Sequence, residues 1–306
     1  IMPSLVGSEM CIRDSNFDIV KKIFKQADEK LDYQISKMIL EGPSDNLQLT
    51  ENTQPAILTV SYSIFKVLKD EFNFDISSFK YFAGHSLGEY SALVCSESLN
   101  FSDAIYLLHE RGKAMQKATP IGTGSMIAIL GKTTNEITDL ISSTKNKKGI
   151  CEIANDNADG QVIVSGDRER VQSLQVILKE KKIKAIPLKV SAPFHCSLMK
   201  SAAEDMQEKI DKTIFNNPLF NIVNNVTAKP QKDTKIIKKL LVEQIFSTVR
   251  WRESILNMSK DGITNYVEIG PGKVLTGMVK RTIKNVNCFS INSITDIKNL
   301  QDGFKK

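Results

Sequence analysis

A serine flanked by glycines is the first candidate for chemistry in this chain of 306 residues. Residues 84–88 read Gly-His-Ser-Leu-Gly, and they join a short apolar segment, residues 79–83, to a run with helical character that begins at Glu89. Between a strand and a helix, the G-x-S-x-G pattern is typical of a nucleophile elbow: a sharp turn exposes the hydroxyl, here of Ser86, and the amide of Leu87 points toward a developing oxyanion. We expect both glycines to be required because such a turn leaves no space for side chains. A glycine-rich turn without a catalytic role is the alternative.

A serine hydroxyl needs a base to become a nucleophile, and the chain has three histidines. His85 is next to Ser86 in the turn, so its side chain should point away from the reacting side of the serine. His109 lies in the middle of a predicted helix. His195 lies where a predicted strand ends and a helix begins, a position that commonly faces a cleft. By elimination we predict that His195 is the base, and a structural loop histidine is the alternative.

An arginine on an apolar helix face bears on the kind of substrate. In a helix predicted to begin near residue 102, Ala104, Leu108, Arg111 and Met115 follow one another at helical spacing, so the arginine shares the inward face. A buried guanidinium is costly unless it meets an anion, and its planar fork suits a carboxylate. Two interpretations stay open at this point. Arg111 binds a carboxylate of the substrate, or it forms a structural ion pair with an internal Asp or Glu, which the residue by itself favours.

Residues 124–190 have the rhythm of a small subdomain. We predict strand, helix, strand, strand, helix and strand at 125–130, 134–143, 150–154, 161–165, 167–182 and 185–190. Asp159-Gly160 is a good hairpin turn between the two middle strands. The order β-α-β-β-α-β is that of a ferredoxin-like layer. We therefore predict a small subdomain inserted within a larger α/β core.

The larger core is predicted on both sides of this insert. Helical periodicity marks residues 17–31, a helix after Thr53 with Pro55 in its first turn, residues 197–210, residues 234–246 and a helix that begins near residue 274. Apolar runs mark strands at 79–83, around 220–223 and at 265–269. Strands that alternate with helices imply an α/β fold with a mostly parallel sheet covered on both faces.

The composition is that of a folded globular protein. The 41 Lys and Arg residues exceed the 35 Asp and Glu residues by six, and 41% of the chain is hydrophobic. The lysines are scattered and aromatic residues make up only 7%, so we expect no nucleic-acid binding. Apolar runs such as 126–130 are far shorter than the roughly 18 residues of a membrane span, so we expect no membrane association. Five cysteines without C-x-x-C spacing are typical of reduced thiols and indicate a cytoplasmic location.

Taken together, the motifs closely resemble those of the malonyl-CoA:acyl carrier protein transacylases, from about residue 17 onward. The matching segments are Thr50-Glu51-Asn52-Thr53-Gln54-Pro55-Ala56, residues 84–90, Arg111-Gly112-x-x-Met115, residues 122–126, Ser191-x-Pro193-x-His195, Asn224-Asn225-Val226 and Glu268-x-Gly270-Pro271-Gly272. The family has a hydrolase-like α/β core with a ferredoxin-like insert. The resemblance therefore implies a core over residues 16–122 and 192–306 and a small subdomain over residues 123–191.

The resemblance also implies roles for the residues that would carry out the reaction. Ser86 matches the serine that is acylated, and His195 matches its general base. Gln244 matches the glutamine whose backbone carbonyl orients the histidine, in place of a carboxylate. The amide of Leu87 is the expected oxyanion donor.

For the substrate, Arg111 matches the arginine that binds the free malonyl carboxylate, and Asn155 and Asn157 match positions that face the cleft. The implied reaction moves the malonyl group from malonyl-CoA to the phosphopantetheine thiol of acyl carrier protein in a ping-pong cycle that supplies fatty acid synthesis. The CoA thioester is a substrate, and no metal or tightly bound cofactor is expected. We expect the protein to act as a monomer.

The first 15 residues, IMPSLVGSEMCIRDS, depart from the family. The family begins with a hydrophobic strand and a Gly-Gln-Gly-Ser-Gln loop whose last glutamine donates a backbone amide to the oxyanion, and residues 1–15 contain neither. We expect this segment to be foreign to the protein. A catalytically impaired relative that only binds CoA or the carrier is therefore one alternative. A serine esterase or thioesterase of the hydrolase type, which shares the elbow, is another.

Overall fold

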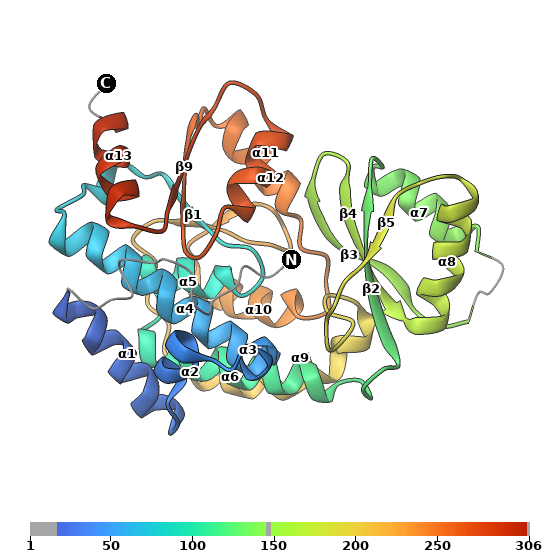
Figure 1. Cartoon of the computed structure of the whole chain (residues 1–306), viewed down its shortest axis with the longest axis horizontal. Coiled ribbons are helices and arrows are strands. Elements are labelled where there is room, and N and C mark those ends of the chain that lie inside the picture. Colours follow the sequence, from blue (N-terminus) through green and yellow to red (C-terminus); the bar gives the residue numbers. More distant parts are fainter. Residues whose placement is uncertain (1–16, 145–147, 305–306) are drawn as a thin grey trace.

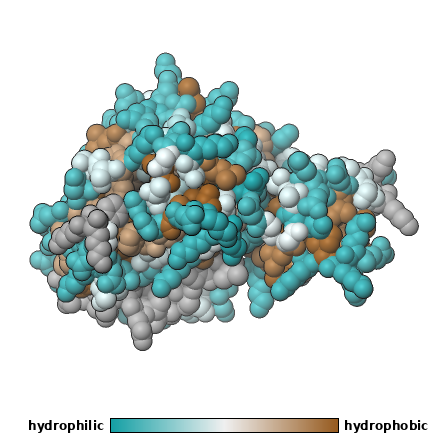
Figure 2. Space-filling view, turned by 90° about the horizontal axis from the view of Figure 1, so that it is seen from above, coloured by the Kyte–Doolittle hydropathy of each residue, from teal (hydrophilic) through white to brown (hydrophobic). Residues whose placement is uncertain are grey.

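The computed structural model describes residues 17–144 and 148–304, so the expectation for residues 1–15 lies outside the described residues. Figure 1 shows a larger part, in which helices surround short strands, beside a smaller part built on one sheet. Figure 2, from above, shows the narrower join between these two parts and a surface on which hydrophilic residues surround scattered hydrophobic patches.

The larger part contains two short parallel pairs of strands. β1 (Tyr81–Ala83) pairs in parallel with β6 (Asn221–Val223), to which β7 (Pro230–Gln231) adds antiparallel, and β8 (Asn265–Ile269) pairs in parallel with β9 (Asn287–Ile291). The helices around them are α1 (Asp18–Leu31), α2 (Ile35–Glu41), α3 (Ser44–Gln48), α4 (Thr50–Lys66), α5 (Gly88–Cys95), α6 (Phe101–Lys117), α9 (Lys200–Lys212), α10 (Thr234–Gln244), α11 (Trp251–Lys260), α12 (Val274–Thr282) and α13 (Ile294–Phe304). Short helical turns are η1 (Val67–Glu71), η2 (Ile76–Ser78) and η3 (Ser197–Met199).

The smaller part confirms the predicted β-α-β-β-α-β order. Its elements are β2 (Gly124–Leu130), α7 (Thr134–Ser142), β3 (Cys151–Ala158), β4 (Gln161–Asp167), α8 (Arg168–Glu180) and β5 (Ala185–Pro187). The strands pair antiparallel in the order β3-β4-β2-β5, which is the ferredoxin-like arrangement. The exact boundaries at residues 123 and 191 stay a prediction.

Both faces of this smaller sheet are buried, which explains the continuous apolar run of β2. Ile127 and Ile129 pack with residues of α7 and α8 in a core of their own. Met126 and Ala128 point to the opposite face, where partly buried Phe194 packs against them. Because alternate residues of a strand face opposite sides, β2 packs on one face against the helices of the smaller part and on the other against Phe194, the residue before His195.

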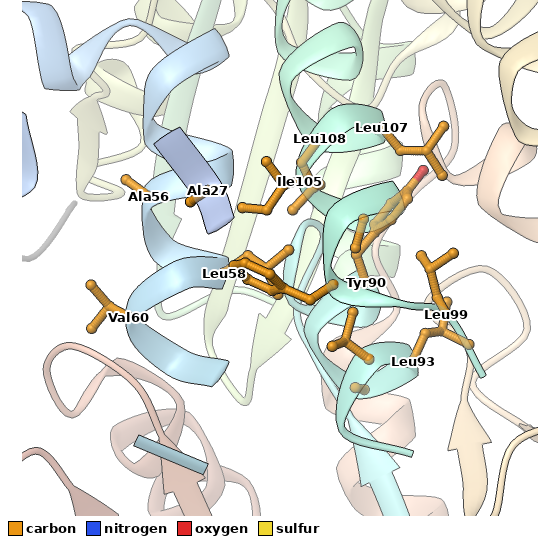
Figure 3. Packing of buried hydrophobic residues seen from close by; sticks show 14 of the residues in the cluster. Ala27, Ala56, Leu58, Val60, Tyr90, Leu93, Leu99, Ile105, Leu107 and Leu108 are labelled. Carbon is orange, nitrogen blue, oxygen red and sulfur yellow. The ribbon is translucent and has the colours of Figure 1, made fainter. Parts of the chain in front are cut away.

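The centre of the larger part is α4, which is buried on almost all sides. α1, α5 and α6 pack around it. Figure 3 shows side chains gathered between these helices, among them Leu58 from α4, Tyr90 from α5 and Ile105 from α6. Burial of each such side chain contributes about 1.5–3 kcal/mol, so these helices hold fixed positions relative to one another.

The start of α4 differs from the sequence prediction. The helix begins at Thr50, so Pro55 lies inside it and not in its first turn. Proline has no N–H, and it leaves the carbonyl of Glu51 without its helical partner. Nδ1 of His109, from α6, donates to that carbonyl at 3.0 Å. A Cβ at Gly112 would lie 2.4 Å from Cα of Glu51, so only glycine allows this close contact between α4 and α6.

Four of the five cysteines lie in the described part, and all four are free thiols: Cys95, Cys151, Cys196 and Cys288. Burial raises the pKa of Cys151 and of Cys196 to about 11, so both stay protonated near neutral pH and are poor nucleophiles. Within residues 17–144 and 148–304, no helix has the length and apolar character to cross a membrane.

Candidate active site

The predicted elbow is a tight turn between β1 and α5. Ser86 adopts a left-handed backbone conformation, with φ +53°, which is strained for a residue other than glycine. A Cβ at Gly84 would lie 1.9 Å from the carbonyl oxygen of Gly88, so the first glycine is required. A Cβ at Gly88 would meet no atom within 4 Å. The expectation that both glycines are required for space is therefore wrong for Gly88, because the position of its Cβ is open.

Two side chains from distant segments hold Ser86 in this conformation. Its N–H donates to Oδ1 of Asn225 at 2.7 Å, and its carbonyl accepts from Nε2 of Gln244 at 3.1 Å. Nδ2 of Asn225 also donates to the carbonyl of Gly84 at 2.8 Å. The surrounding structure thus supplies the bonds that maintain a strained residue at the end of a strand.

His195 lies beside the serine, as predicted. Its Nε2 is 2.8 Å from Oγ of Ser86, and its Nδ1 is 2.9 Å from the backbone carbonyl of Gln244. A carbonyl only accepts, so Nδ1 carries the proton and Nε2 accepts the hydrogen bond from the hydroxyl of Ser86. Burial first, and then the charge of Arg111, lower the pKa of His195 to about 3. The imidazole is therefore neutral near pH 7 and able to take a proton from Ser86.

Arg111 reaches the same serine from α6 and is only 1% exposed. Its Nη2 donates to Oγ of Ser86 at 3.0 Å and to Oε1 of Gln244 at 2.9 Å, and its Nη1 donates to Oε1 of Gln54 at 2.6 Å. These partners are all uncharged. Within the described residues no Asp or Glu forms an ion pair with Arg111, so the direct structural ion pair is absent. Of the five N–H groups of the guanidinium, the one on Nε has no acceptor in the described part.

The amide of Leu87 lies at the N-terminal end of α5. No described residue accepts a hydrogen bond from it. Helix N-termini carry a partial positive charge, so this N–H suits a developing oxyanion beside Ser86. The structure thus brings His195 and Arg111 to Oγ of Ser86, with Leu87 next in the chain, and Gln244 contacts both the imidazole and the guanidinium.

The comparisons with known proteins agree with this geometry. Residues 13–305 match the family model described as the acyl transferase domain. The malonyl CoA-acyl carrier protein transacylase of Haemophilus influenzae is 38% identical over 289 residues, which cover 94% of this chain and 92% of that protein. This chain belongs to the malonyl CoA-acyl carrier protein transacylase family. It is an acyltransferase with the mixed α/β fold of that family.

Solved structures of the family superimpose over almost the whole chain. The acyl-carrier-protein S-malonyltransferase of Bartonella henselae has a TM-score of 0.92 and 34% identity, over 98% of each chain. A malonyl-transacylase in complex with a type II PKS acyl-carrier protein has a TM-score of 0.92 and 34% identity, over 99% of this chain and 97% of that one.

Asn155 and Asn157 lie in β3, where the smaller part meets the larger one, and both are buried. Oδ1 of Asn157 is 2.8 Å from Nε2 of His85, whose ring packs edge-on against Trp251. The side chain of His85 thus contacts Asn157 and Trp251, and the imidazole within hydrogen-bond distance of Oγ of Ser86 is that of His195. The backbone of Asn155 pairs with that of Val249 in an isolated parallel bridge. Asn157 thus contacts His85, the residue next to the nucleophile in the chain, and the backbone of Asn155 pairs with the larger part at Val249.

Sequence reasoning missed Gln54, Asn225 and Glu89 as parts of the site. Gln54 and Asn225 lie in segments that match the family, but nothing in their spacing shows that they contact Arg111 and Ser86. Glu89 is an acid at the start of an apolar helical run and is only 1% exposed. A charge in such a run, and its place in the family-matching segment 84–90, were the signals that could have identified it. Among the described residues, no cluster of three or more His, Cys, Asp or Glu side chains could hold a metal ion.

Proposed function

We propose that this chain transfers the malonyl group from malonyl-CoA to the phosphopantetheine thiol of acyl carrier protein, through a malonyl ester on Ser86, and so supplies fatty acid synthesis. One observation carries the proposal. Oγ of Ser86 is within hydrogen-bond distance of a neutral imidazole, 2.8 Å away, and of a buried guanidinium without an acidic partner, 3.0 Å away. A base and a carboxylate-binding group thus meet at one nucleophile.

In the first half-reaction, Oγ of Ser86 forms a bond to the thioester carbon of malonyl-CoA while its proton moves to Nε2 of His195. The amide of Leu87 stabilises the oxyanion of the tetrahedral intermediate. The carbon–sulfur bond then breaks, and the CoA thiolate takes the proton from His195. The backbone carbonyl of Gln244 keeps the imidazole in the required tautomer throughout, and it stabilises the charged form that exists between the two proton transfers.

The second half-reaction uses the same groups in reverse. His195 takes the proton of the carrier's phosphopantetheine thiol, and the thiolate attacks the carbonyl carbon of the malonyl ester. The carbon–oxygen bond to Ser86 breaks, and Oγ regains its proton from His195. The carbonyl carbon of the malonyl group is the electrophile in both half-reactions, so the cycle needs only the residues of the chain and its two substrates.

Arg111 provides the selectivity for malonyl in this proposal. Its guanidinium lies beside Ser86, and the N–H group on its Nε has no acceptor among the described residues. A malonyl carboxylate would accept hydrogen bonds from the guanidinium, whereas an acetyl group would leave a buried charge unpaired. We expect Asn155 and Asn157 to contact the thioester arm of the substrate from the side of β3.

The competing functions make different predictions. In a hydrolase-type esterase an acid precedes a late C-terminal histidine, but no histidine follows His195 in this chain. An esterase would release free malonate faster than it loads the carrier. A relative that only binds CoA or the carrier would show no burst of acylation with malonyl-CoA. We expect the protein to act as a monomer in the cytoplasm, which stays a prediction.

The decisive experiment is intact-mass measurement after the protein is mixed with malonyl-CoA. We expect a covalent malonyl adduct on the wild-type chain and none on Ser86→Ala. Ser91→Ala is the matched control, because Ser91 is a hydroxyl on α5 that has no hydrogen-bond partner in the described part. A surviving adduct on Ser86→Ala would place the nucleophile elsewhere. Loading of carrier protein by the isolated adduct then tests the second half-reaction.

A further inference from the structure

Behind the active site lies a buried carboxylate to which the proposed reaction assigns no role. Glu89 is 1% exposed, and hydrogen-bond donors surround it. Its Oε1 accepts from Nδ2 of Asn224 at 2.5 Å, and its Oε2 accepts from the backbone N–H of Asn225 at 3.0 Å and from Nε2 of Gln244 at 2.8 Å. All three neighbours donate, so this site requires a group that only accepts.

Glu89 and the backbone carbonyl of Ser86, 3.1 Å from Nε2 of Gln244, together determine which way the amide of that glutamine faces. A side-chain amide has one donor end and one acceptor end. Because Nε2 of Gln244 donates to Glu89, its Oε1 must face the opposite way, and there it accepts from Nη2 of Arg111 at 2.9 Å. The same Nη2 lies 3.0 Å from Oγ of Ser86. Glu89 and Arg111 are thus joined by one amide group, without direct contact between their charges.

We propose that Glu89 is a positioning residue that fixes the orientation of the Gln244 amide and, through it, the guanidinium that selects malonyl. This inference rests on the proposed function, since it concerns the selectivity of the same site. A residue with a purely structural role would influence all acyl groups equally. A residue that orients Arg111 influences malonyl far more than acetyl.

The substitution Glu89→Gln tests the orientation directly, because it keeps the size of the side chain but replaces one acceptor oxygen with a donor. If the new NH₂ group faces Asn225 and Gln244, the amide of Gln244 must turn and present a donor to Arg111. If the new NH₂ group faces Asn224, the side-chain amide of Asn224 must turn. This breaks the hydrogen bond, 2.8 Å long, that the backbone N–H of Val226 donates to Oδ1 of Asn224. The backbone N–H of Asn225 cannot turn, so the first arrangement leaves it facing a donor, whereas the second places the mismatch at Asn224 and Val226.

The experiment measures single-turnover acylation by malonyl-CoA and by acetyl-CoA. We expect Glu89→Gln to lower the malonyl-to-acetyl rate ratio by about tenfold or more, the effect of one mismatched buried hydrogen bond. Glu268→Gln is the matched control, because Glu268 also accepts two hydrogen bonds, from the N–H groups of Leu275 and Thr276 at the start of α12. Within the described residues Glu268 makes no hydrogen bond or ion pair with Gln244 or Arg111, and we expect Glu268→Gln to leave the ratio unchanged.

Two outcomes distinguish a failure of the proposed function from a failure of the positioning role of Glu89. If the wild-type chain forms no malonyl adduct, the proposed function fails. If the wild type forms the adduct but Glu89→Gln slows both acyl donors equally, the positioning role is refuted and Glu89 is only structural. Where Glu89→Gln does not fold, Gln244→Leu tests the link between Glu89 and Arg111, since it removes the amide that joins them but keeps the backbone carbonyl that binds His195. A wild-type ratio in Gln244→Leu would also refute the inference.

Discussion

Replacement of Arg111 by alanine should change which acyl group the protein accepts. The guanidinium is almost completely buried and lies 3.0 Å from the nucleophile, so no solvent cation can take its place. In the proposed complex two of its N–H groups bind the malonyl carboxylate. At about 1.5 kcal/mol for each charge-assisted bond, the lower end of the usual range, malonyl loses about 3 kcal/mol. Since 1.4 kcal/mol corresponds to a factor of ten, kcat/KM for malonyl-CoA should fall about 10²-fold.

Acetyl-CoA should respond in the opposite direction. It offers no carboxylate, so in the wild type it leaves the guanidinium without a partner in a buried site. Arg111→Ala removes that penalty, and the malonyl-to-acetyl ratio should therefore fall by more than 10²-fold. The substitution also leaves Oε1 of Gln54 and Oε1 of Gln244 without a donor, at about 1–3 kcal/mol each in stability. A lower melting temperature is thus expected but does not by itself explain a change of ratio.

The assay is burst acylation with labelled malonyl-CoA and acetyl-CoA, followed on folded protein. Arg170→Ala is the control, because Arg170 is another buried arginine, 7% exposed, whose Nη2 donates to the carbonyl of Ile141 in the smaller part. It should lower stability and leave the ratio unchanged. An unchanged ratio in Arg111→Ala would refute the role of the guanidinium, and an equal change in both variants would show that the effect is one of stability alone.

The remaining predictions concern protonation and packing. A neutral sulfonyl fluoride should modify Ser86 at a rate that stays constant from pH 8 to about 5, because burial lowers the pKa of His195 to about 3. A decline of this rate centred near pH 6.5 would show that burial does not lower the pKa of His195. In the unfolded chain His195 has its ordinary pKa of 6.5, whereas in the folded protein its pKa is about 3. Between pH 6.5 and 3 only the unfolded chain therefore binds a proton at His195, and the free energy of unfolding falls as the pH is lowered through this range. Denaturant titrations at several pH values can measure this loss. Gly84→Ala should prevent or strongly weaken folding, whereas Gly88→Ala should hardly change the melting temperature, since only the first Cβ meets backbone atoms. His109→Ala should cost about 1 kcal/mol by leaving the carbonyl of Glu51 unpaired, and Pro55→Ala in the same chain should recover part of that loss if the helical N–H is what is missing.

The parts of the fold that follow local rules were predictable from the sequence. The strand, turn and helix around Ser86, the inward face of the helix that carries Arg111 and the β-α-β-β-α-β insert all depend on periodicity or on a glycine within a few residues. Their ends shift by only a few residues in the structure. The helices α2 and α3 and the strand β7 were not predicted from the sequence, because such short elements carry too few periodic positions to stand out. The helices α11 and α13 and the strand β9 were also not predicted.

The position of Pro55 and the freedom at Gly88 show where local reasoning fails. Proline inside α4 is tolerated because His109, 58 residues away from Glu51, donates to the carbonyl that the proline leaves free. A Cβ at Gly88 would meet no atom within 4 Å, although the residue lies in the same turn as Gly84. At Pro55 a contact between distant segments decides what a local rule would have assigned to one residue.

The sequence by itself determined the candidates: a serine at an elbow, one histidine by elimination, an arginine on an apolar face, and the family whose motifs contain them. The tertiary structure alone decided that these three side chains meet at one oxygen atom. It also decided that Asn225, 139 residues away, holds Ser86 in its strained conformation, and that Gln244 joins a buried carboxylate to the guanidinium. The physical reason is that the direction of a hydrogen bond depends on which atoms face each other across the fold, and residue type and spacing do not contain that information.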